Sequence, residues 1–219
     1  MNRSATPLVL VVVLLGLLAT AAPAHDHHPK QAGPQNPQEP EAKAVSIKLP
    51  DVELLDQDGK RLKFKTDVVK DRLVVIDTIY TTCPVICPIL SATFANVQQS
   101  LGDRLGKEVF LISISVDPTT DVPPRLKAYA ERWEARPGWI FLTGQKNSVD
   151  RVLQGLGVYS ADYTVHPPSI LVGDGRRGEW TRFYGFATPE LILGKVEQLR
   201  NGRMAKSHEG VPGIVGHPR

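Results

Sequence analysis

The stretch that decides the fold runs LVVIDTIYTTCPVIC and spans residues 73–87. Its first part, Leu73–Tyr80, is apolar and mostly β-branched, which is typical of a buried strand. From about Pro84 to Leu105, apolar side chains recur at three- and four-residue intervals, which predicts a helix. The stretch therefore predicts a buried strand that passes directly into a helix, with two cysteines, Cys83 and Cys87, at the junction.

The same kinds of pattern continue on both sides of this stretch. Before it, short strands are expected at 45–49, 52–55 and 61–64, with a turn at 56–59 that makes an N-terminal β-hairpin. After it, strands are expected at 109–116, 139–142, 170–172 and 180–184, and helices at 126–133, 149–156 and 189–199. Strands that alternate with helices imply a mainly parallel sheet, and a terminal hairpin adds antiparallel strands. The expected fold is an α/β sandwich with a central mixed β-sheet flanked by helices.

Length and composition point to one ordinary globular domain. The chain has 219 residues, 42% of them hydrophobic and 22% charged, with a formal net charge of +3. A single domain of about 150–160 residues with short appendages fits this length. The basic residues are scattered and aromatic residues are few, so the sequence does not predict a nucleic-acid partner.

The N-terminal segment predicts export. Arg3 precedes an apolar run, Leu8–Leu18, and Ala22-Pro23-Ala24 provides a small-x-small cleavage site, so residues 1–24 resemble a signal peptide. The alternative is an uncleaved membrane anchor, although the run is short for a span of about 20 residues. The expected organisation is a signal peptide at 1–24, a flexible linker at 25–44, the folded domain at 45–204 and a flexible tail at 205–219.

The two cysteines are best interpreted as a functional site. A separation of four residues places both sulfurs on one face of the first helical turn, with Pro84 suited to the first helical position. The positive end of a helix favours thiolates, and paired thiolates suit copper(I). A redox-active disulfide and a pair of small buried apolar residues are the alternatives. An exported chain makes free cysteines a liability, which leaves a metal site and a redox site as the leading interpretations.

A histidine could supply a third ligand to copper(I). His166 is the one histidine expected within the folded region, just before a core strand; the others are His25, His27, His28, His208 and His217. In a fold of the expected kind, the loop that enters this strand faces the helix terminus where the cysteines lie. The proposed metal ligands are therefore Cys83, Cys87 and His166.

Several blocks resemble the Sco/SenC family of copper chaperones. They are YTTCPVICP at 80–88, ISVDP at 114–118, WIFLTG at 139–144, and the His166 loop that runs into LVGDG at 171–175. The resemblance covers about residues 45–200. It implies a thioredoxin-like fold, copper bound by both cysteines and the histidine, and assistance in assembling the dinuclear copper centre of cytochrome c oxidase. Some members of the family act instead as thiol-disulfide reductases on the cysteines of that centre.

One position departs from the family pattern. The family usually has aspartate just before the histidine, whereas this chain has Val165 there and Pro167-Pro168 after it. Asp117 matches the family block but is expected to cap a turn, since a carboxylate is a poor copper(I) ligand. Asp77, in the strand before the cysteines, is expected to be a partnered polar residue of the strand; the alternative is that it is buried near the thiols and influences their ionisation.

Two functions of different classes follow. The first is a copper(I)-binding chaperone whose acceptor is cytochrome c oxidase subunit II or another copper protein. The second is a periplasmic thiol-disulfide oxidoreductase in which Cys83 and Cys87 are catalytic and other thiol proteins are the partners. Cleavage after Ala24 would also expose His25-Asp26-His27-His28, a segment suited to copper(II), although a plain hydrophilic spacer has the same composition. The exported protein is expected in the periplasm, free or anchored to the inner membrane.

Overall fold

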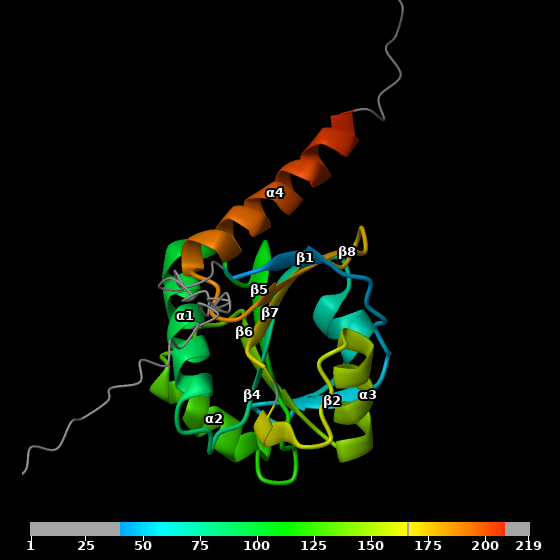
Figure 1. The fold of residues 1–219 in the computed structure, drawn as a ribbon. Helices are drawn as coiled ribbons and strands as arrows, with labels where there is room; N and C mark the ends of the chain where they lie inside the picture. The colour runs from blue at the N-terminus through cyan, green and yellow to red at the C-terminus, as the bar shows by residue number, and fades with distance from the viewer. Residues whose placement is uncertain (1–39, 166, 209–219) are drawn as a thin grey trace, which may run out of the picture. The chain divides into compact units, whose positions relative to one another are not determined.

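The computed structural model describes residues 40–165 and 167–208 (Figure 1). Within this part of the chain, the strands form one eight-stranded sheet in the order β1-β8-β7-β4-β5-β6-β2-β3. The strands are β1 (Ala42–Ala44), β2 (Glu53–Asp56), β3 (Arg61–Lys63), β4 (Leu73–Ile79), β5 (Val109–Ser115), β6 (Trp139–Thr143), β7 (Ser169–Asp174) and β8 (Glu179–Tyr184). The helices are α1 (Ile86–Leu101), α2 (Pro123–Arg132), α3 (Lys146–Leu156) and α4 (Pro189–His208), with short turns η1 (Phe64–Val69), η2 (Gly102–Arg104) and η3 (Tyr163–Val165).

The sheet is mixed, as the sequence predicts. Strands β4, β5 and β6 run parallel to one another, because helices α1 and α2 each return the chain to the same end of the sheet before the next strand begins. The β2–β3 and β7–β8 pairs are antiparallel hairpins. The predicted α/β sandwich with an N-terminal hairpin is therefore confirmed.

Each face of the sheet carries its own apolar core. Alternate residues of β4 point to opposite faces, so Val75 and Ile79 join one core while Val74 and Ile76 join the other. Helices α1, α2 and α4 supply the first core, and α3 with η1 supplies the second (Figure 1). Strand β4 is buried along its whole length, so the loop that carries the cysteines to α1 starts from a well-anchored strand.

Some element boundaries differ from the predictions. Strand β1 lies within the expected linker and pairs with β8, and residues 45–49 form no strand. Helix α4 continues to His208, past its expected end at 199 and into the expected tail. The prediction that Pro84 starts the helix is wrong, because α1 begins at Ile86. Such boundaries depend on partners distant in sequence and on the backbone angles of single residues.

Candidate functional site

The two cysteines lie in one hydrogen-bonded turn between β4 and α1. The backbone N–H of Tyr80 points at the sulfur of Cys87 at 3.5 Å, and the N–H of Cys87 points at the sulfur of Cys83 at 3.3 Å. The N–H of Cys83 donates to the carbonyl of Tyr80 at 3.1 Å. Cys83 is partly exposed and Cys87 is buried, and neither is in a disulfide. The turn therefore brings both sulfurs to one site and opens it to solvent on the Cys83 side.

The sulfur of Cys83 takes the place of a helix cap. Val85 occupies the N-cap position without a side-chain hydrogen bond, so the first-turn N–H groups of α1 need other acceptors. The Cys87 N–H is one of these groups, and it finds the sulfur of Cys83. The predicted stabilisation of a thiolate by the helix terminus thus arises from this contact.

The environment of Cys83 favours its thiolate. Partial burial by itself would raise the pKa of the Cys83 thiol. The backbone N–H groups of Cys87 and Val85, the Cys87 thiol and the Tyr80 hydroxyl all stabilise the anion, and together they lower the pKa below its ordinary value. Donation to Cys83 is also the main reason that the pKa of Tyr80 rises to about 12.

The environment of Cys87 favours its neutral thiol. Burial is the largest cause of its raised pKa, and the negative charges of Cys83 and Asp77 add to the shift. Asp77 lies in β4 and is 1% exposed, and neither of its carboxylate oxygens makes a hydrogen bond of normal geometry, although the nearby Ser113 hydroxyl lowers its pKa in part. The structure thus supports the alternative in which a buried Asp77 influences thiol ionisation, since its charge adds to the raised pKa of Cys87. The two thiols therefore differ in acidity as well as in exposure.

A buried carboxylate fixes the loop that carries the cysteines. Asp121 is 0% exposed and accepts a hydrogen bond from the Ser115 hydroxyl at 2.7 Å. It also accepts the hydroxyl of Thr81 at 2.6 Å and the N–H of Thr81 at 3.1 Å. Asp117, four residues earlier, accepts the N–H of Thr120 at 3.3 Å, which confirms its predicted role in a turn. Sequence reasoning assigned no role to Asp121, since no local pattern distinguishes it.

A tyrosine pair links the cysteine loop to the segment before residue 166. The rings of Tyr80 and Tyr163 meet edge to face with their centroids 5.3 Å apart. The nearby Asp117 carboxylate is the main cause of the raised pKa of Tyr163 and also accepts its hydroxyl. His166, the predicted third ligand, lies outside the described residues. The structure therefore packs Tyr163, which lies three residues before His166, against Tyr80 of the cysteine loop.

The donor set at the turn consists of two soft sulfur atoms. Within residues 40–165 and 167–208, no three side chains of histidine, cysteine, aspartate or glutamate form a group suited to a metal ion. Two thiolates are typical ligands of copper(I), and zinc in structural sites takes four ligands. The chemistry of this donor set fits copper(I), with one position left for a further ligand.

Comparison with known proteins identifies the family. A family model described as SCO1/SenC matches residues 41–198. The chain belongs to the SCO1/SenC family. The SCO1 protein homolog of Bacillus subtilis is 35% identical over 94 residues, which are 42% of this chain and 47% of that protein. The chain thus spans about half the length of the curated relatives that it matches.

Solved structures of Sco proteins share the fold. Bradyrhizobium japonicum ScoI, solved with copper bound, is 27% identical with a TM-score of 0.56, covering 71% of this chain and 98% of that one. BsSco, described with a disulfide switch as a member of the Sco family of cytochrome c oxidase assembly proteins, is 24% identical. Its TM-score is 0.60, and the match covers 71% of this SCO1/SenC protein and 95% of BsSco. The predicted thioredoxin-like fold is confirmed.

The predicted export segment precedes the part of the chain that the structure describes. Residues 1–24 and the histidines at 25, 27 and 28 lie outside the described residues. In the part of the chain that the structure describes, no helix has the length and apolar character needed to cross a bilayer.

Proposed function

We propose that this SCO1/SenC protein binds copper(I) through Cys83, Cys87 and His166 and delivers it to, or prepares, the dinuclear copper centre of cytochrome c oxidase. The acceptor would be subunit II of the oxidase or another copper protein. The observation that carries the proposal is the turn in which the Cys87 N–H meets the Cys83 sulfur while Tyr80 holds the Cys87 sulfur. This turn already holds both sulfur ligands close together, so binding a metal requires no rearrangement of the turn.

The unequal thiols suit both capture and release of a copper ion. Cys83 favours its thiolate and is partly exposed, so it can bind the metal first and meet an acceptor's cysteines. Cys87 loses its proton when the metal binds, because metal ligation and protonation compete for the same sulfur. Copper then passes to the acceptor by stepwise ligand exchange, without a change in oxidation state.

The tyrosine contact supports His166 as the third ligand. Tyr163 packs on Tyr80, whose hydroxyl donates to Cys83, and only Thr164 and Val165 separate Tyr163 from His166. A span of three residues reaches at most about 11 Å. This contact therefore holds the start of the segment within a short span of the cysteines.

Apolar side chains beside the thiols favour a protein acceptor. Val85, within the cysteine turn, is 57% exposed, and Ile89, in the first turn of α1, is 44% exposed. Exposed apolar side chains next to a reactive group are common at protein interaction sites. The signal segment at residues 1–24 supports a periplasmic protein, free or anchored through its N-terminus, and His25–His28 remain a proposed copper(II) site.

Thiol-disulfide exchange is the second candidate, and the opposite pKa shifts of the two cysteines favour it. The Cys83 thiolate would attack a partner disulfide, forming a mixed disulfide and releasing one partner thiolate. Cys87, after losing its proton, would attack the Cys83 sulfur and release the second partner thiolate. The partner disulfide is reduced to two thiols while Cys83 and Cys87 become a disulfide.

Replacing His166 separates the two functions. The reduced protein is titrated with copper(I) under anaerobic conditions against a competing chelator, with thiols counted in parallel. His166→Ala should weaken copper(I) binding by at least about tenfold, because one of three ligands is lost. Disulfide exchange should continue at nearly the wild-type rate, since both thiols remain.

His208→Ala is the matched control, because it removes a histidine from the end of α4 and should leave copper binding unchanged. A wild-type copper affinity in the His166→Ala protein would refute His166 as a ligand. If Cys83→Ser and Cys87→Ser both kept the bound copper ion, the site as a whole would be refuted.

A further inference from the structure

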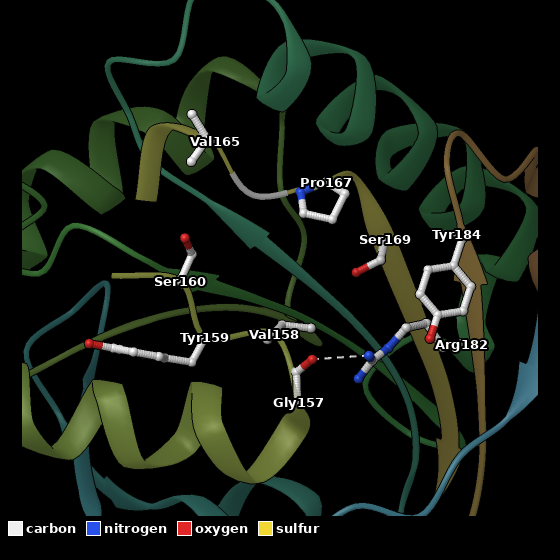
Figure 2. A pocket seen from close by; sticks show the side chains of 9 residues that line it. All are labelled: Gly157, Val158, Tyr159, Ser160, Val165, Pro167, Ser169, Arg182 and Tyr184. Atoms are coloured by element: carbon white, nitrogen blue, oxygen red, sulfur yellow. Dashed lines mark hydrogen bonds between the residues drawn. The ribbon is translucent and has the colours of Figure 1, made fainter. Parts of the chain in front are cut away.

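A second site, apart from the cysteines, lies beside strand β8. A pocket of about 280 Å³ opens between the segment that follows α3 and strands β7 and β8 (Figure 2). Its walls include the apolar side chains of Val158, Val165 and Pro167 and the ring of Tyr184. The volume lies just below the 300–1,000 Å³ typical of ligand pockets, so it suits a small molecule.

The charged group on the wall of this pocket is Arg182. Its side chain points from β8 toward the end of α3 (Figure 2). Arg182 is only 9% exposed, and its Nη1 donates to the carbonyl of Gly157 at 3.0 Å while Nη2 donates to the carbonyl of Leu156. The Nε atom is buried without a hydrogen-bond partner. The guanidinium is thus held in place by backbone atoms.

The charge of Arg182 has no carboxylate counterpart. Among the residues that the structure describes, every ion pair within 4.0 Å involves other side chains. The C-terminus of a helix such as α3 carries only about half of a negative elementary charge. Buried arginines are usually paired, because removing a full charge from water is costly. A substantial part of this positive charge is therefore available to an anion.

The other charged groups near the pocket are already engaged. Lys43 lies 5.7 Å from the centre of the Tyr184 ring but pairs with Glu41 at 2.8 Å. The carboxylate of Asp162 accepts the N–H and the hydroxyl of Thr164 at 2.9 and 2.6 Å. Arg182 is consequently the cation that would receive a ligand.

We propose that this pocket binds a small organic carboxylate through Arg182, with the short carbon chain against the apolar wall. A guanidinium has five N–H donors, and the two carbonyls leave one on each Nη atom for the ligand. One fixed positive charge matches a monoanion, and the remaining N–H groups can each donate to a carboxylate oxygen. The pocket shares no residue with the cysteine turn, but Val165 and Pro167 of its wall flank His166, so the proposal is tested on the metal-free protein.

The test is a titration of the reduced, metal-free full chain with sodium acetate, followed by NMR. The amide signals of Gly157 and Tyr184 should shift and saturate with acetate, and they should not saturate with chloride at equal ionic strength. Arg182→Met should weaken this binding by at least about tenfold, because the charge-assisted bonds are lost. Arg125→Met, which removes an exposed arginine elsewhere, is the control and should bind acetate as the wild type does.

A second variant is needed because Arg182→Met could unfold the protein by removing the hydrogen bonds to the end of α3. Ser160→Leu leaves Arg182 in place and adds a bulky apolar side chain to the pocket wall, so it should weaken acetate binding while remaining folded. Absence of saturation in the wild type, or equal binding by Ser160→Leu, would overturn the proposal. Saturation with inorganic phosphate in place of acetate would overturn the assignment of a carboxylate.

Discussion

The buried carboxyl of Asp77, in the strand that precedes the cysteines, allows a quantitative test of how strongly burial disfavours its negative charge. The side chain is 1% exposed, and burial raises its pKa from 3.8 to about 7, although the Ser113 hydroxyl offsets part of the shift. Replacing it by asparagine keeps the shape of the side chain and removes the titration. The perturbation therefore isolates the free energy of placing one negative charge in this core.

The sign of the effect follows from the two pKa values. The folded state holds the Asp77 proton more tightly than the unfolded state, so the related stability is present below about pH 4 and is lost as the pH rises to about 7. The difference of about three pH units corresponds to about 4 kcal/mol. Between about pH 4.5 and pH 8, the expected loss is about 3 kcal/mol.

Urea denaturation of the reduced, metal-free protein at several pH values measures this loss. From about pH 4.5 to pH 8, the free energy of unfolding of Asp77→Asn should rise by about 3 kcal/mol relative to the wild type. The buried amide carries its own cost of about 1–3 kcal/mol, but this cost does not depend on pH. Asp71→Asn, at an exposed position just before β4, is the control and should follow the wild type.

Parallel stability curves for the wild type and Asp77→Asn would refute the reasoning. They would mean that the Asp77 carboxyl titrates at the same pH in the folded and unfolded states, which requires water or a partner at its oxygens. Equal urea m-values in both proteins are needed for the comparison, because a changed m-value indicates a changed unfolded state.

Further predictions concern the thiols and two glycines. With limiting iodoacetamide near neutral pH, Cys83 should be alkylated well before Cys87, because its pKa is lowered and it is partly exposed; peptide mass spectrometry showing equal rates would contradict the assigned thiolate. Gly173→Ala should lower the free energy of unfolding by at least about 1–3 kcal/mol, because a Cβ there would clash with the ring of Trp180. Gly194→Ala, with open space at the Cβ position in α4, should instead raise it by about 0.5–1 kcal/mol; urea midpoints moving in the same direction for both variants would contradict this account.

Much of the fold could be predicted because its signals are local. The β-branched runs at β4 and β5 and the three- and four-residue spacing in α1 each lie within one short window. Strand β1 could not be found in this way, since Ala42–Ala44 become a strand only through pairing with β8. The start of α1 was misplaced because it depends on the backbone angles of Val85.

The candidate site divides in the same manner. The spacing of Cys83 and Cys87 at a strand–helix junction indicated paired sulfurs from sequence alone. Asp121 could not be recognised, because it meets Thr81 across 40 residues of chain. The contact between Tyr80 and Tyr163 is likewise a product of the folded chain.

The sequence by itself determined the alternation of strands and helices, the family pattern and the two adjacent thiols, since each depends on neighbours along the chain. Only the tertiary structure decided which thiol is the more acidic, which carboxyl is deprived of water and which buried arginine is left without a carboxylate partner. Those properties depend on burial and on distances between segments far apart in sequence, and no short window of residues encodes either one.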